Sequence, residues 1–134
     1  MINYLLVYSD WGLLALRVVL GVILIAHGFP KIKNIRGTAS WMGPLGFKPA
    51  IFWAAVVSSL EFFGGILLLL GFLTQIVSAL VAIQFIVVIL KVNSKKGLVG
   101  GFELDLMILS ASIALLTLGS GEISLDRSLG LFLY

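Results

Sequence analysis

Two residues of opposite charge, Arg17 and Glu61, lie in the middle of two long apolar runs. The chain has only 9 basic and 6 acidic residues among 134, so a charge inside such a run needs an explanation. An ionised group deep in a bilayer is costly unless it meets a partner or a polar cavity. A glycine follows each charge by four positions, Gly21 in the first run and Gly65 in the second. We therefore expect Arg17 and Glu61 to pair with each other.

This predicted pair has two interpretations. It can be purely structural, since a guanidinium is long enough to join two helices and stays charged. Alternatively, it lines a polar pocket for a quinone carbonyl or another small polar headgroup, where Glu61 also exchanges protons. Gln84, near the middle of a later apolar run, would then be a further contact for the substrate. The sequence leaves both interpretations open.

His27 and Glu103 are the other candidates for chemistry. His27, the only histidine, can exchange protons near neutral pH or hydrogen-bond to the last carbonyls of its helix. Glu103 begins the fourth apolar run, where a carboxylate favours a helix N-terminus, and a position near His27 would also let it contact a substrate. Asp105 points about 200° away from Glu103 on a helix. With one histidine and no cysteine, we expect no metal site and no covalently bound cofactor, leaving quinone as the candidate cofactor.

Four apolar runs occupy most of the chain and must position these residues. The composition is 60% hydrophobic and 11% charged, and about 20 apolar residues cross the roughly 30 Å bilayer core as a helix. We therefore expect an all-α fold, an integral membrane four-helix bundle. It would form a single membrane-embedded domain, residues 1–134, with spans at about 11–28, 50–72, 73–92 and 102–119.

Helical spacing predicts which face of each span turns inward. Small residues let membrane helices approach closely, so stripes of small and polar residues are expected inside the bundle. In the first span this stripe is Arg17, Gly21, Leu24 and Gly28, and in the second it is Ala54, Ser58, Glu61 and Gly65. In the fourth span it is Glu103, Met107, Ser110, Ala114 and Thr117.

The loop between spans one and two predicts a short amphipathic helix at the membrane interface. Pro30 suits its first turn, and Gly43-Pro44 ends it. Its apolar residues recur at helical spacing, at Ile32, Ile35, Ala39 and Met42.

Basic residues predict the orientation in the cell membrane. Seven of them lie near the loops after spans one and three: Lys31, Lys33, Arg36, Lys48, Lys91, Lys95 and Lys96. Only Arg127 lies on the other side, and cytoplasmic loops hold the excess of Lys and Arg. We therefore expect a multi-pass protein with both termini outside the cytoplasm. A reporter that works only in the cytoplasm should be inactive when fused after Tyr134.

Six short motifs, taken in order, resemble the DoxX family. They are Arg17, His27-Gly28-x-x-Lys31, Glu61-x-x-Gly64-Gly65, Gly71-Phe72-Leu73-Thr74, Gly100-Gly101-Phe102-Glu103 and Ser124-Leu125-Asp126-Arg127. The family usually has a basic residue after the threonine of the fourth motif, where this chain has Gln75. Members are similar to the membrane subunit of thiosulfate:quinone oxidoreductase, and others resemble partners in membrane-associated oxidoreductase complexes. The resemblance thus implies the fold strongly and a link to oxidoreductases more generally.

Two functions of different classes are consistent with these observations. In the first, the protein is a small membrane subunit of a quinone-linked oxidoreductase system, with Arg17, Glu61, Glu103 and Gln84 contacting the substrate. Glu61 and His27 would exchange protons. In the second, it is a non-catalytic scaffold or assembly partner that holds another protein through its basic loops. A proton-coupled carrier would have to dimerise. The expected partners are the lipid bilayer, an oxidoreductase subunit and a second copy of the chain, but no nucleic acid.

Overall fold

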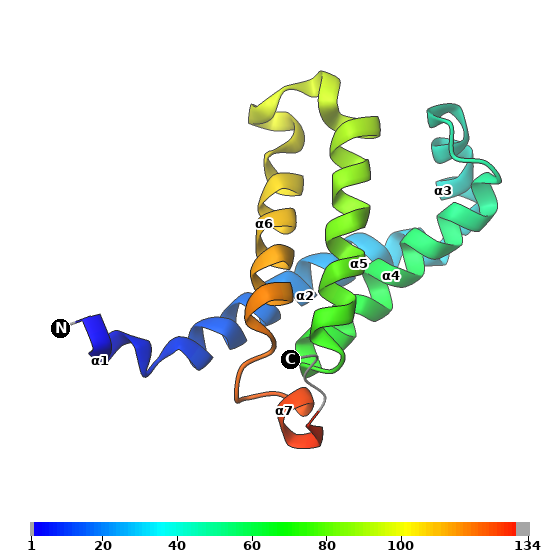
Figure 1. Cartoon of the computed structure of the whole chain (residues 1–134). Helices are drawn as coiled ribbons and strands as arrows, with labels where there is room; N and C mark the ends of the chain where they lie inside the picture. Colours follow the sequence, from blue (N-terminus) through cyan, green and yellow to red (C-terminus); the bar gives the residue numbers. More distant parts are fainter. Residues whose placement is uncertain (1, 131–134) are drawn as a thin grey trace.

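The computed structural model describes residues 2–130, and the described chain is helical without strands (Figure 1). Four helical segments are long and apolar enough to cross a membrane: Ser9–Lys33, Ala50–Leu70, Thr74–Lys96 and Leu98–Leu118. The first two are α2 and α4. The third combines α5 (Thr74–Val87), η2 (Val88–Asn93) and η3 (Ser94–Lys96), and the fourth combines η4 (Leu98–Phe102) and α6 (Glu103–Leu118). The predicted all-α membrane fold is confirmed.

The remaining elements are short. They are α1 (Ile2–Leu6), α3 (Ile35–Met42), η1 (Gly43–Leu45) and α7 (Leu125–Leu129). The spans form two antiparallel pairs, α2 with α4 and α5 with α6. Figure 1 shows that the pairs lie close together near α7 and diverge toward α3 and the hairpin between α5 and α6. Toward α3 and the hairpin, the two pairs therefore pack less closely against each other than they do near α7.

Helices α2 and α4 approach closely along their small-residue stripes. A Cβ added to Gly65 would lie 2.7 Å from the Gly21 carbonyl oxygen, and one added to Gly28 would lie 2.5 Å from the Phe62 backbone nitrogen. No larger side chain fits at those contacts without moving a backbone. All four stripe residues predicted for each of spans one and two are buried, so this part of the bundle was predicted correctly.

The predicted inner stripe of span four is wrong. Met107 is 68% exposed, and Glu103, Ser110 and Thr117 are exposed too, whereas the buried residues of α6 are Ile108, Ser112 and Leu115. The serines of α6 do not indicate which face of the helix is buried. Ser110 donates to the Leu106 carbonyl oxygen and Ser112 to that of Ile108, each four residues back in its own helix. A serine satisfied within its own helix can face either lipid or protein.

The amphipathic helix between spans one and two is α3. Its buried residues Ala39 and Met42 form a small core with Ala54 of α4. Its start differs from the prediction, because Pro30 lies in the last turn of α2 and that helix continues to Lys33. Asn34 begins α3 instead, with its Oδ1 accepting a hydrogen bond of 3.0 Å from the Gly37 amide. Asparagine at this position satisfies an amide that the first turn of a helix leaves free.

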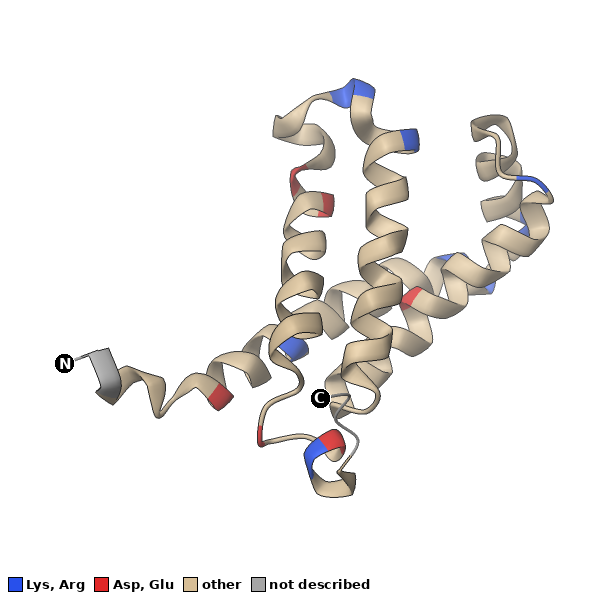
Figure 2. Cartoon of the chain, viewed as in Figure 1, with Lys and Arg blue, Asp and Glu red and all other residues tan. Residues whose placement is uncertain are grey.

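Basic residues gather at the diverging end of the molecule. Figure 2 shows blue segments on the hairpin between α5 and α6 and along the stretch from the end of α2 to the start of α4. Both chain ends described here lie away from that end. The excess of positive charge still predicts that the diverging end faces the cytoplasm.

Candidate functional site

Arg17 and Glu61 do not pair with each other. Arg17 donates from Nε to the Leu68 carbonyl oxygen at 3.0 Å. Glu61 instead accepts from Lys31 and Gln84. The cause is the register of the antiparallel helices: with Gly21 against Gly65, Arg17 lies beside Leu68, about two helical turns or roughly 10 Å from Glu61. The predicted pair is therefore wrong, and each charge has its own set of partners.

Arg17 joins the C-terminal segment to the last turn of α4. Besides Leu68, its Nη1 donates to the carbonyl oxygens of Ser120 at 2.6 Å and Ile123 at 2.9 Å. All three acceptors are backbone groups. The Leu68 carbonyl also accepts from the Gly71 amide at 3.1 Å, whereas the Ser120 and Ile123 carbonyls lie in a loop where intrahelical donors are lacking, so the guanidinium supplies donors to groups that the helices leave free.

Asp126 completes this junction. Its carboxylate accepts from the backbone amides of Leu73 at 2.6 Å and Thr74 at 2.9 Å, at the start of α5. Its own amide donates to the Gly71 carbonyl oxygen at 2.8 Å. We call Arg17 and Asp126, with the backbone groups that they bind, the Arg17 cluster. Three of the six sequence motifs meet in it, since Arg17, the Gly71–Thr74 turn and the Ser124–Arg127 motif all contribute.

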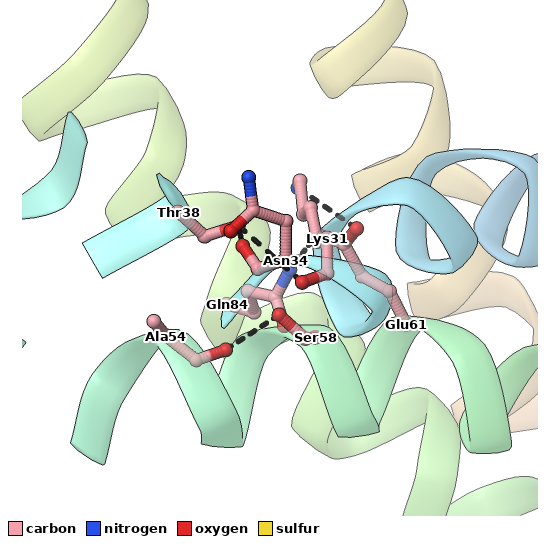
Figure 3. A network of polar contacts seen from close by, with 7 residues as sticks. All are labelled: Lys31, Asn34, Thr38, Ala54, Ser58, Glu61 and Gln84. Atoms are coloured by element: carbon pink, nitrogen blue, oxygen red, sulfur yellow. Dashed lines mark hydrogen bonds and ion pairs between the residues drawn. The ribbon is translucent and has the colours of Figure 1, made fainter. Parts of the chain in front are cut away.

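A second polar group, the Glu61 cluster, consists of Lys31, Glu61 and Gln84. The Lys31 Nζ lies 2.9 and 2.8 Å from the two carboxylate oxygens of Glu61, and the Gln84 Nε2 lies 2.6 Å from Oε1 (Figure 3). The Glu61 side chain is 2% exposed and that of Lys31 is 30% exposed. The cluster thus joins α2, α4 and α5 through side chains, and one of its members reaches the surface.

The Gln84 amide has a fixed orientation in this cluster. An ionised carboxylate only accepts hydrogen bonds, so the NH₂ group of Gln84 must face Glu61. The Gln84 Oε1 therefore points away from Glu61. It is buried and has no hydrogen-bond partner within residues 2–130. Such an acceptor is free to take a donor from a bound molecule.

The Glu61 cluster lines a cavity of about 520 Å³. Ligand sites for small organic molecules typically measure about 300–1,000 Å³ and combine apolar walls with a few polar groups. Here the walls are mostly aromatic and aliphatic. The polar residues among them are His27, Lys31, Glu61, Gln84, Asn93, Lys96 and Asp105.

Three of the predicted site residues line this cavity together: Glu61, Gln84 and His27. His27 is exposed and makes no hydrogen bond to any residue that the structure describes. The capping role considered for it is wrong, because α2 continues to Lys33 and its last turn lies beyond His27. His27 lines the cavity, and its proton-exchange role stays a prediction.

Arg17 and Glu103, predicted as substrate contacts, lie outside the cavity. Arg17 is directed to the backbone carbonyls of its own cluster. Glu103 is exposed, and its Oε1 accepts a hydrogen bond of 3.1 Å from the Gly100 amide at the start of the fourth span. This contact matches the alternative interpretation of Glu103, a carboxylate that stabilises a helix N-terminus.

Sequence reasoning missed Lys31 and Asp105. Lys31 entered the sequence analysis as a charge that sets orientation and as part of a family motif but not as a site residue, although it follows His27 by four residues and so lies on the same helix face. Asp105 was not predicted as a site residue, yet it lines the cavity and accepts a hydrogen bond from Asn93. The expectation that Asp105 faces away from Glu103 agrees with this placement.

The sequence of this chain has relatives among known proteins. The model of the DoxX family matches residues 12–94. The chain belongs to the DoxX family. It is 36% identical over 115 residues to the Bacillus subtilis protein named "Putative oxidoreductase CatD", covering 86% of this chain and 84% of that relative.

Two Escherichia coli relatives are named as inner membrane proteins. YqjF is 31% identical over 125 residues, covering 90% of this chain and 94% of the relative. YphA is 29% identical over 134 aligned residues, covering 90% of this chain and 96% of the relative. These names agree with a multi-pass membrane protein. No solved structure matches the chain.

Proposed function

We propose that this DoxX-family protein is a small membrane subunit of a quinone-linked oxidoreductase system and that its cavity binds the quinone headgroup. The observation that supports this proposal is the Glu61 cluster itself, which places an ion pair and an unpartnered acceptor at a cavity whose walls are mostly aromatic and aliphatic. The name of the Bacillus subtilis relative agrees with a redox role.

The polar groups of the cavity fit the chemistry of a quinone headgroup. A quinone carbonyl accepts hydrogen bonds, and the Lys31 ammonium has three donors but a single carboxylate partner. A quinol hydroxyl donates, and the Gln84 Oε1 is a buried acceptor without a donor among the described residues. A buried acceptor left unpaired costs about 1–3 kcal/mol, which a ligand hydroxyl would recover. Both oxidation states of the ligand therefore have a complementary group in the same cluster.

Glu61 and His27 are the residues that would handle protons. Reduction of a quinone consumes protons as well as electrons, and a carboxyl or imidazole group within reach can deliver them once it has itself taken up a proton from the solvent side. Glu61 lies at the buried end of the cavity and His27 is exposed, so His27 would exchange protons with the solvent side. The electrons would come from a partner oxidoreductase subunit.

Binding can be measured by quenching of tryptophan fluorescence in lipid nanodiscs. Two of the three tryptophans, Trp41 and Trp53, line the cavity, and a Trp11→Phe background removes the third. A short-tailed benzoquinone should quench this emission saturably. Lys31→Met should weaken binding about tenfold, the loss expected from one charge-assisted hydrogen bond. Lys33→Met is the matched control, because Lys33 is exposed beside Phe29 and does not line the cavity.

Proton handling is tested by Glu61→Gln, which keeps the size of the side chain but cannot exchange a proton. In membranes that contain the protein, quinone-linked turnover should fall, whereas Glu103→Gln should leave it unchanged. Normal turnover of well-expressed Glu61→Gln protein would exclude the proton role. Quenching that never saturates in the wild type would exclude quinone binding.

The second candidate function is a scaffold that holds another protein. The clustered basic residues at the diverging end favour it, because an acidic partner surface would be attracted there (Figure 2). If quinone does not bind, co-isolation of a partner that is lost when Lys95 and Lys96 are both changed to Glu would support this function instead.

A further inference from the structure

We infer that the cavity opens sideways into the bilayer between α4 and α5 and that its ligand is an amphiphile drawn from the lipid phase. The ligand's polar headgroup would reach the Glu61 cluster while its apolar tail leaves between Val56 and Ile83. This inference rests on the proposed function for the identity of the headgroup, and it adds the route of entry and the need for a tail.

The opening is formed by two facing apolar stripes. On α4, Trp53, Val56 and Leu60 recur at helical spacing, and on α5, Leu80, Ile83 and Val87 do the same. All six side chains line the one cavity, so the two stripes face each other across it. Glu61 and Gln84 directly follow Leu60 and Ile83 in sequence. Their 2.6 Å hydrogen bond joins the two helices beside the stripes.

The outer edges of these stripes are exposed rather than covered by protein. Val56 is 40% exposed, Leu80 is 48% exposed and Ile83 is 60% exposed. A residue that both lines a cavity and lies on the molecular surface marks a place where the cavity reaches that surface. Their exposed fractions show that the described residues leave this edge partly uncovered.

The position of this edge along the two helices places it within the hydrocarbon core of the bilayer. At 1.5 Å per residue, Ile83 lies about 14 Å along the third span from Thr74, and Val56 lies about 21 Å along α4 from Leu70. Both positions fall within a core of roughly 30 Å. The exposed edge therefore contacts lipid tails, and a ligand that passes it needs to be soluble in them.

Three further polar lining residues lie at the hairpin end of the cavity, whereas His27 lies on α2. Asn93 and Lys96 come from the end of the third span, and Asp105 comes from the start of α6. They offer nothing for an apolar chain to contact. A ligand with its headgroup at Glu61 therefore has a charged exit on one side and an apolar exit on the other, and a tail matches only the apolar one.

The test narrows the apolar exit without touching the polar cluster. Val56→Phe combined with Ile83→Phe adds two rings at the edge, and overfilling such a space is expected to weaken binding of a tailed ligand about tenfold or more. The ligand pair is decylubiquinone and a tail-less benzoquinone with the same ring substituents. Both are titrated in nanodiscs by quenching of Trp41 and Trp53. The matched control is Val19→Phe combined with Ile113→Phe, since those residues are exposed on α2 and α6 and do not line the cavity.

The expected result is selective: the edge variant loses affinity for decylubiquinone, keeps the wild-type affinity for the tail-less ring, and the control variant changes neither. Equal losses for both ligands, or no loss for either, would overturn the lateral opening while leaving headgroup binding intact. If the wild type binds neither ligand, the proposed function fails first, and the inference fails with it.

Discussion

The Arg17 cluster and the Glu61 cluster each centre on a charged side chain that is 2% exposed within a membrane span. Their partners differ. Arg17 binds three backbone carbonyls whose positions the helices and the C-terminal segment fix. Glu61 binds two side chains that can rotate, and one of them, Lys31, is 30% exposed. A buried charge is thus compatible with either a structural or a ligand-binding role, and the nature of its partners distinguishes the two.

The two clusters also differ in how accessible they are to a ligand. The Arg17 cluster is enclosed by its own backbone partners, so a ligand would have to displace part of the chain to reach the guanidinium. The Glu61 cluster adjoins a cavity and retains a free acceptor on Gln84. Membrane spans hold charged groups only where something compensates them. In one cluster the fold supplies all of that compensation, and in the other a ligand can supply part of it.

The largest effect is expected from Arg17→Leu. It leaves the Ser120 and Ile123 carbonyls without the guanidinium donor, removes one of the two donors to the Leu68 carbonyl, and should lower the free energy of unfolding in detergent by about 3–5 kcal/mol. Arg17→Lys should recover little, because an ammonium lacks the planar fork that reaches separate acceptors. The remaining folded protein should bind quinone normally. Reduced affinity in that fraction would mean that the two clusters are not separate.

A double-mutant cycle between Lys31 and Glu61 should show a smaller effect, with Lys31→Met and Glu61→Leu coupled by about 1–3 kcal/mol. The loss of stability caused by removing Glu61 alone is moderated, because Lys31 is partly exposed and can turn to solvent. Glu61→Gln should destabilise less than Glu61→Leu, since it keeps a hydrogen-bonding group. In the companion cycle, the Arg17→Leu and Glu61→Leu losses should add within about 0.5 kcal/mol. Strong coupling of Arg17 with Glu61 would contradict the register described above.

The smallest effect is expected from Asp126→Asn. The amide keeps one acceptor oxygen for the Leu73 and Thr74 backbone amides but loses the charge, so unfolding should become easier by about 1 kcal/mol, as for loss of a helix cap. Asp10→Asn is a comparison from the same end of the molecule, because Asp10 accepts a single amide hydrogen bond, from Glu122. A larger loss for Asp10→Asn than for Asp126→Asn would show that Asp126 does not anchor the C-terminal segment.

The sequence by itself determined the membrane class, the four spans, the amphipathic helix α3 and the inward stripes of α2 and α4. These follow from local properties, namely apolar length and the spacing of small residues along one helix. It also marked Glu61, Gln84 and His27, because polar side chains inside or beside an apolar run are conspicuous.

Only the tertiary structure decided which group each charge meets. The partners of Arg17 are carbonyl oxygens, which every residue carries and which leave no signature in the sequence. The separation of Arg17 from Glu61 depends on the register of two antiparallel helices, set by the contact of Gly21 with Gly65. The buried face of α6 depends on how that helix packs against α5, since its serines are satisfied within their own helix. The cavity exists because the two helix pairs diverge, which no single segment specifies.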